Sequence, residues 1–130
     1  MNQLNRQPLF TRLDTVIIRV RSLDTACFWY QNVLGLRPVH KDLEKEKLAV
    51  LDTGGQISLT IWQLKPGEQF PPHGTVGSYP ILLSEDIVAA RETLQERGVD
   101  VEEMQVDDCV NSFGFYDPDG NRFEVCQINC

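Results

Sequence analysis

Short runs of β-branched and apolar residues, interrupted by one stretch of helical periodicity, characterise the first half of the chain. The period-2 runs predict strands over residues 13–20, 36–41, 47–51 and 56–63. Between the first two strands, Ser22 offers a helix N-cap and Gly35 a helix stop. Apolar residues recur there at helical spacing, at Ala26, Cys27, Tyr30, Val33 and Leu34. The predicted order is strand, helix, strand, strand, strand.

The same order returns after a segment that contains many helix- and strand-breaking residues. Residues 64–77 hold Pro66, Gly67, Pro71, Pro72, Gly74 and Gly77, a density that predicts a linker. Beyond it, a helix is predicted over residues 86–97, capped near Glu85 or Asp86 and stopped by Gly98. Strands are predicted over residues 78–83, 99–106, 109–116 and 121–127.

The two halves also agree in local detail. Gly35 and Leu36 at the end of the first helix match Gly98 and Val99 at the end of the second, and residues 52–55 match the turn at residues 117–120. A duplication explains this agreement, although two unrelated segments of similar length are the alternative. We therefore predict one α+β domain over residues 1–130. It comprises a first module at 13–63, a linker at 64–77 and a second module at 78–127.

Composition and charge narrow the function classes. The hydrophobic share of 42% and the charged share of 24% suit a globular protein. No segment approaches the roughly 20 apolar residues that span a bilayer, and residues 1–12 lack the apolar core of a targeting signal. We therefore expect a cytoplasmic protein without a membrane partner. The net charge of −7 also argues against nucleic acid as a partner. A negative charge of this size either favours binding of a cationic ligand or only keeps the protein soluble.

The four cysteines do not form a metal-binding pattern. Cys27, Cys109, Cys126 and Cys130 include no CxxC pair and have no histidine at zinc-like spacing. Because no secretory signal is present, we expect reduced thiols. A reactive thiol at Cys126 is the alternative, although no neighbouring His or Lys would lower its pKa.

Strand alternation predicts which side chains share a face. In the fourth strand, Ser58, Thr60 and Trp62 lie opposite an apolar face that suits packing against a helix. In the last strand, Arg122, Glu124 and Cys126 share the more polar face, as Thr15, Ile17 and Arg19 do in the first. These faces suit a sheet curved around a ligand cavity, or a solvated outer surface. Aromatic residues near the cavity, such as Phe113, favour a pocket.

Two motifs resemble those of a known family. WYQNVLGL, at the end of the first predicted helix, is similar to the FYxxxLGL signature of the glyoxalase, bleomycin-resistance and extradiol dioxygenase superfamily. DPDGNRFEV is similar to its DPDGxxxEL ending. The resemblance covers residues 13–127 and implies two βαβββ modules that form U-shaped mixed sheets around a cleft, usually in a homodimer.

Metal-dependent members of this superfamily hold a divalent ion on the inward faces of the first and last strands of each module. Matched residue by residue, these positions fall on Thr15, Ser58, Tyr79 and Glu124. Only Glu124 is a usual ligand type, so we predict no metal and no other cofactor. Glu124 alternatively pairs with Arg122 or Arg19. The histidines, His40 and His73, stand outside the ligand positions, and His73 is a candidate lid contact.

The leading hypothesis is therefore a metal-independent protein that captures a small organic ligand. Hydroxyl groups and Glu124 would orient the ligand, and Trp62 and Phe113 would stack on it. The residues predicted to line the cleft are Thr15, Arg19, His40, Ser58, Thr60, Trp62, Tyr79, Phe113 and Glu124. The rival is a lyase, isomerase or dioxygenase that uses Glu124 as the catalytic residue in an altered metal site. A dimer with a regulatory or structural role and no ligand is the third alternative.

Overall fold

A computed structural model describes residues 7–72 and 74–130, so the proposed lid residue His73 lies outside the described residues. The first module consists of β1 (Thr15–Val20), α1 (Leu23–Asn32), β2 (Arg37–Asp42), β3 (Leu48–Asp52) and β4 (Ser58–Gln63). The second consists of β5 (Ile81–Leu83), α2 (Ile87–Glu96), β6 (Gln105–Val106), β7 (Val110–Tyr116) and β8 (Arg122–Ile128). The predicted α+β class with two βαβββ modules is confirmed.

Both helices begin and end where the local sequence predicts. The Ser22 side chain accepts a hydrogen bond from the backbone N–H of Thr25, and the Asp86 side chain accepts one from Ala89. Gly35 and Gly98 follow the helices with φ of 75° and 81°, a left-handed conformation that favours glycine. Within the described ranges, neither helix has the length and hydropathy needed to cross a membrane.

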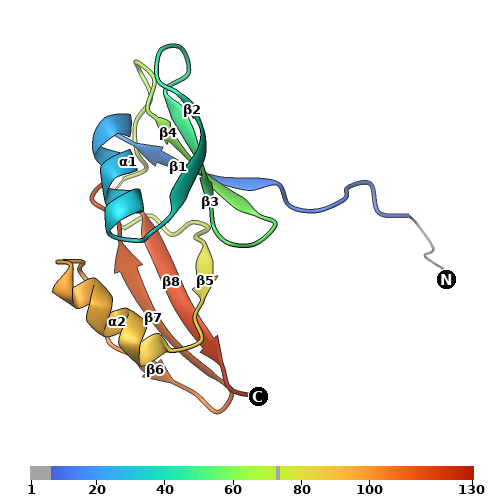
Figure 1. Ribbon diagram of the computed structural model, residues 1–130, viewed down its shortest axis with the longest axis vertical. Helices are drawn as coiled ribbons and strands as arrows, with labels where there is room; N and C mark the ends of the chain where they lie inside the picture. Colours follow the sequence, from blue (N-terminus) through green and yellow to red (C-terminus); the bar gives the residue numbers. More distant parts are fainter. Residues whose placement is uncertain (1–6, 73) are drawn as a thin grey trace.

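Each module forms one four-stranded mixed sheet (Figure 1). The strand orders are β1-β4-β3-β2 and β5-β8-β7-β6, and in each sheet the first pair is parallel and the others are antiparallel. The second module repeats the first at a spacing of 64 residues. Gln63 accepts a hydrogen bond from the backbone N–H of Leu23, and Gln127 accepts the corresponding bond from Ile87.

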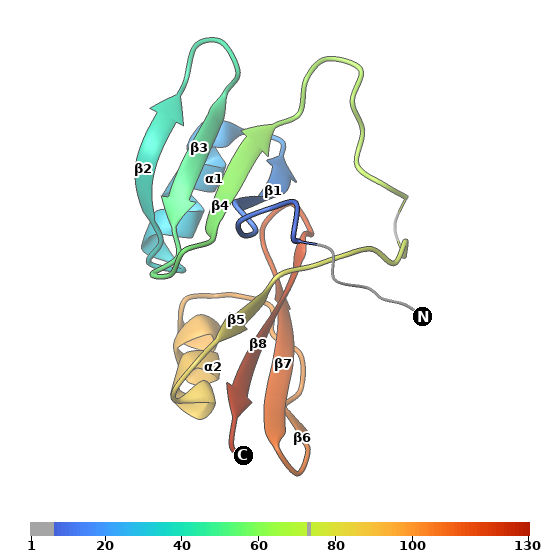
Figure 2. The ribbon, with the colours of Figure 1, turned by 90° about the vertical axis from the view of Figure 1, so that its right-hand side faces the viewer.

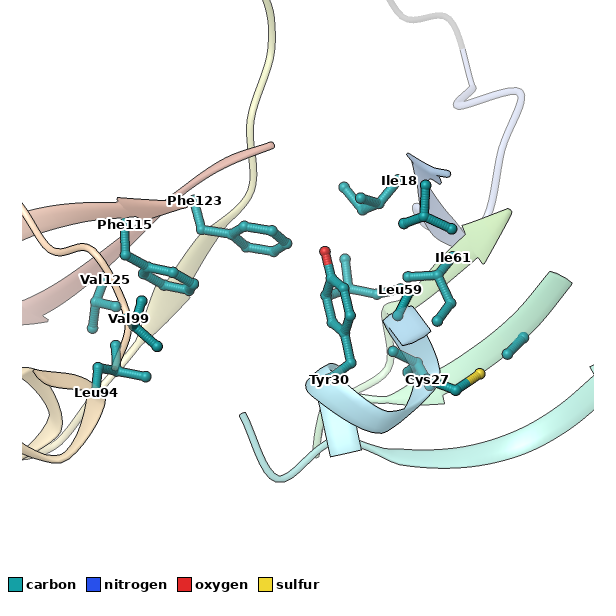
Figure 3. Close-up of a cluster of buried hydrophobic side chains, with 14 of the residues drawn as sticks. Ile18, Cys27, Tyr30, Leu59, Ile61, Leu94, Val99, Phe115, Phe123 and Val125 are labelled. Carbon is teal, nitrogen blue, oxygen red and sulfur yellow. The ribbon is translucent and has the colours of Figure 1, made fainter. Parts of the chain in front are cut away.

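The core lies on the helix-facing side of each sheet (Figure 3). In module two the rings of Phe115 and Phe123 stack with centroids 5.1 Å apart. Phe113 belongs to the same face, because it pairs with Val125 across the strands, and it is only 1% exposed. The prediction that Phe113 lines the cleft and stacks on a ligand is therefore wrong. The residue packs in the core instead.

A buried polar joint connects the two modules, which lie end to end (Figures 1 and 2). The Tyr30 hydroxyl of α1 donates a hydrogen bond of 2.6 Å to Asp117, in the turn between β7 and β8. Asp117 also accepts bonds from the backbone N–H groups of Asp119 and Asn121, and the Asn121 amide donates to the carbonyl of Arg19. Burial raises the pKa of Asp117, and burial together with Asp117 raises that of Tyr30. The tyrosine therefore keeps the proton that it donates.

Two predicted strands are shorter than expected. The strand predicted over 99–106 is reduced to β6 and a single bridge from Val101 to Phe115. The strand predicted over 78–83 begins at Ile81. Pro80 has no backbone N–H to contribute to the ladder, although its carbonyl accepts a bond from Glu124. Tyr79 consequently precedes β5.

The cysteines also depart from the prediction of four reduced thiols. Cys109 and Cys130 form a disulfide, with Cα atoms 5.0 Å apart, whereas Cys27 and Cys126 are free. Antiparallel pairing explains the contact, because Val110 faces Ile128 and the backbone N–H of Asn129 bonds to the carbonyl of Cys109, which brings the following Cys130 close to Cys109. The partners are 21 positions apart, so the sequence shows the contact only once the register of β7 and β8 is known.

Removing the Tyr30 hydroxyl should destabilise the fold. Tyr30→Phe leaves Asp117 buried without its side-chain donor from α1, so we expect a loss of about 1–3 kcal/mol in the free energy of unfolding. Urea denaturation followed by far-UV circular dichroism measures it. Phe28→Leu, at an exposed position on the same helix, is the control and should change stability by less than about 0.5 kcal/mol. Equal stability of Tyr30→Phe and wild type would contradict the role of the joint.

Removing the Cys109–Cys130 disulfide should also lower the stability of the fold. Cys130→Ser opens a covalent loop, and we expect it to lower the free energy of unfolding by roughly 3 kcal/mol under oxidising conditions. In excess dithiothreitol the variant and wild type should unfold at the same urea concentration. A difference that persists after reduction would show that the serine acts through local contacts instead.

Candidate ligand-binding site

The strand register places the predicted residues of module one on one face, opposite α1. Thr15 pairs with Ser58, Ile17 with Thr60, and Arg19 with Trp62 across β1 and β4. His40 lies in the same row as Thr60, since both pair with Val50, but it is exposed on the edge strand β2. Thr15 Oγ1 and Thr60 Oγ1 share a hydrogen bond of 2.8 Å, and Thr60 is only 4% exposed. These hydroxyl groups therefore already satisfy each other.

Arg19 connects this face to the linker. Its Nε donates to the carbonyl of Trp62 at 3.1 Å, and its Nη2 donates to the carbonyl of Gln63 at 3.1 Å and forms an ion pair with Glu68. The guanidinium also lies 5.5 Å from the centroid of the Trp62 ring. The backbone N–H of Lys65 and the Arg19 guanidinium hold the pKa of Glu68 below its usual range. Arg19 thus fastens the linker over the edge of the sheet.

A denser network covers the corresponding face of module two, with Arg122 at its centre. Arg122 Nη1 donates to Glu102 Oε2 at 2.7 Å and to the Tyr116 hydroxyl at 3.0 Å, while Nη2 donates to Glu124 Oε2 at 3.0 Å. The Tyr116 hydroxyl in turn donates to Glu102 at 2.9 Å. The guanidinium carbon lies 5.2 Å from the centroid of the Tyr79 ring. Glu124 was predicted to form an ion pair with Arg122 or Arg19, and in the structure it pairs with Arg122.

The charges in this network shift the pKa of its members. Hydrogen bonds from Arg122 and Tyr116 lower the pKa of Glu102, and the pairing with Glu102 and Glu124 raises that of Arg122. The hydrogen bond and charge of Glu124 raise the pKa of Tyr79. At neutral pH, Glu102 and Arg122 are therefore ionised, and Tyr79 keeps its proton.

A cavity of about 480 Å³ lies between these two faces, beside the linker. Its lining includes Ile17, Arg19, Phe70, Pro80, Asn121 and Arg122. Of the residues predicted to line the cleft, Arg19 is in the lining of this cavity, whereas Phe113 packs in the core and the others are not among the lining residues. Sequence reasoning placed Arg122 on the right face but did not assign it to the site. The part played by Phe70 depends on the path of the linker, which local patterns do not predict.

The residues at the predicted metal-ligand positions do not fit a divalent ion. Thr15, Ser58 and Tyr79 offer neutral hydroxyl groups, and Glu124 is paired with Arg122. The 64-residue spacing also makes Arg122, not Glu124, the counterpart of Ser58, since Gln127 corresponds to Gln63. In residues 7–72 and 74–130, no cluster of three or more His, Cys, Asp or Glu side chains could hold a metal.

Solved structures of similar proteins share this fold. The crystal structure of SMU.1112c matches with a TM-score of 0.74 and 24% identity, covering 89% of this chain and 98% of the other. TnmS3, an antibiotic-binding protein from Streptomyces sp. CB03234, matches with a TM-score of 0.77 and 23% identity, covering 94% and 99%. A putative glyoxalase family protein from Bacillus anthracis matches with a TM-score of 0.78 and 20% identity, covering 95% and 99%.

These structural matches, at 20–24% identity, show the fold, and the family is shown by the sequence itself. The chain has no match among curated proteins. The model of one family, however, matches residues 12–125, which include the first module, most of the second and the two motifs. The chain belongs to the glyoxalase, bleomycin resistance protein and dioxygenase superfamily.

Proposed function

We propose that the protein captures a small organic molecule, without a metal ion, in the cavity between its two modules. The observation that carries the proposal is the cavity itself. Its volume of about 480 Å³ falls within the roughly 300–1,000 Å³ of typical small-molecule sites. Its lining combines apolar side chains with a few oriented polar groups, as ligand sites do.

The polar groups at the cavity are held in place before any ligand arrives. Arg19 is fixed by two backbone carbonyls and Glu68, and Arg122 by two carboxylates and Tyr116. Asn121 is fixed by its bond to the carbonyl of Arg19. Side chains that are already ordered lose little conformational entropy on binding, which favours recognition of a compact ligand. The hydroxyl groups and carboxylate predicted to orient the ligand, at Thr15, Ser58, Tyr79 and Glu124, would surround this region.

The antibiotic-binding neighbour TnmS3 supports capture over turnover, because a protein of this fold is described by what it binds. The poor fit of the donor set to a divalent ion supports it further, since metal-dependent chemistry would need stronger ligands. Catalysis by Glu124 as a general base would require a substrate proton within reach. In the structure this carboxylate faces the guanidinium of Arg122.

We further propose a cytoplasmic homodimer. Ile81 and Leu83 on the sheet of module two are 55% and 71% exposed, and Ile17 on module one is 43% exposed. A second copy of the chain would cover these apolar side chains and close the open faces of the sheets. The Cys109–Cys130 disulfide lies at the opposite end of β8 from Arg122, so capture would not require it if the cytoplasm reduces it.

Ligand titration with intrinsic tryptophan fluorescence tests the proposal. The EDTA-treated protein should give a saturable change with at least one member of a panel of aromatic antibiotics and naphthyl amines, alcohols and carboxylates. Trp62 contacts Arg19 at the cavity, whereas Trp29 packs against the core. Trp29→Phe should therefore keep the response, and Trp62→Phe should lose most of it.

Three results would count against the proposal. If no compound of the panel changed the tryptophan fluorescence, the proposed capture function would be wrong. A response that EDTA abolishes, or nearly stoichiometric zinc, manganese, nickel or iron in protein purified without chelator, would show a metal-dependent site instead. If light scattering at micromolar concentration gave the mass of a monomer, the proposed homodimer would be wrong.

A further inference from the structure

Two carboxylates converge on one guanidinium in module two. Arg122 uses both terminal nitrogens, one toward Glu102 at 2.7 Å and one toward Glu124 at 3.0 Å. The Glu102 side chain is 43% exposed, so the better shielded of the two contacts is the one to Glu124. Arg122 is 30% exposed and Glu124 is 20% exposed, and both lie on strand β8. Charge-assisted hydrogen bonds of this geometry are the strong ones in proteins.

The backbone of β7 leaves room for this pair. Gly114 lies opposite Glu124 in the strand register. A Cβ atom at Gly114 would lie 2.6 and 2.7 Å from the two terminal nitrogens of Arg122, and closer still to Glu102 Oε1. The φ of Gly114 is not in the left-handed region, so the constraint here is one of space: a side chain would displace the ends of Glu102 and Arg122. Glu102 and Arg122 therefore cross the strand where any other residue would place a side chain.

The electrostatics of the cluster resemble those of a cation site. Glu102 and Glu124 together carry two negative charges, Tyr79 and Tyr116 add hydroxyl oxygens or ring faces, and Arg122 supplies the single positive charge at the centre. A guanidinium and a divalent cation would compete for the same carboxylate oxygens. Adding a metal would require breaking two charge-assisted bonds and exposing Arg122 to a like charge.

We infer that Arg122 is a built-in cation that occupies the carboxylate cluster of module two in place of a metal ion. It is a positioning residue, since it orients Glu124 and Tyr79 and excludes divalent ions from them. The inference rests on the proposed metal-independent capture and gives that proposal a structural cause. It also explains why Glu124 would not bind a metal, although its carboxylate is the best metal ligand among the residues at the predicted metal positions.

Removing the guanidinium should therefore create affinity for a divalent ion. In Arg122→Ala, Glu102 and Glu124 face each other without a counter-charge, and hydroxyl groups of Tyr79 and Tyr116 lie beside them. We expect the variant to bind Zn²⁺ or Mn²⁺ at least tenfold more tightly than wild type by isothermal titration calorimetry. Arg122→Lys keeps a positive charge at this position and should stay close to wild type.

Matched controls separate this effect from adventitious binding. Arg19→Ala removes the other cavity arginine, which pairs with a single carboxylate, Glu68, and should gain no metal affinity. The double variant Arg122→Ala with Glu124→Gln should lose the gained affinity. Arg122→Gln, which keeps a hydrogen-bonding amide, provides a second test if Arg122→Ala does not fold by circular dichroism, and the same gain is expected.

The outcomes distinguish this inference from the proposed function. A folded Arg122→Ala or Arg122→Gln variant that binds Zn²⁺ and Mn²⁺ no better than wild type would overturn the inference. If EDTA-treated wild type then still captured a ligand, the proposed function would stand without it. Tight stoichiometric metal binding by wild type itself would overturn both.

Discussion

The buried hydrogen bond from Tyr30 to Asp117 joins the two modules at the point where their cores meet, with the Tyr30 ring 6.0 Å from that of Phe123. Asp117 accepts bonds from Tyr30, from the side chain of Asn121 and from two backbone N–H groups, so its carboxylate is satisfied although it is 4% exposed. The same turn leads directly into β8. Asn121 and Arg122 therefore reach the cavity from a segment that the joint immobilises, and the linker returns to the same place through Arg19 and Glu68.

The two modules use one backbone plan for different chemistry. At the 64-residue spacing, Thr15 and Thr60 correspond to Tyr79 and Glu124, and Ser58 corresponds to Arg122. Module one carries a neutral hydroxyl pair, whereas module two carries a charged network. Because the backbone ladder is the same, side chains could diverge without loss of the fold. This division allows one module to contribute hydrogen-bonding groups and the other to set the charge of the site.

In the proposed metal-independent capture, the charged network of module two would take the place of an ion. A carboxylate left unpaired on a half-buried face is costly, and a metal or a guanidinium can each remove that cost. Here Arg122 does so, and Gly114 provides the space. The arginine needs no supply of metal and fixes its carboxylates rigidly, which suits binding better than polarisation of a substrate.

The order of elements, both helix caps, the duplication and the polar faces of β1, β4 and β8 followed from the sequence, because caps and period-2 alternation depend on neighbours along the chain. The resemblance of WYQNVLGL and DPDGNRFEV also determined the family. Tertiary structure alone decided the rest. Phe113 was assigned to the wrong face, the Cys109–Cys130 bond was missed, and Arg122 was not placed at the site. Each depends on which residue of one strand faces which residue of another, and that register is set by packing between distant segments rather than by local pattern.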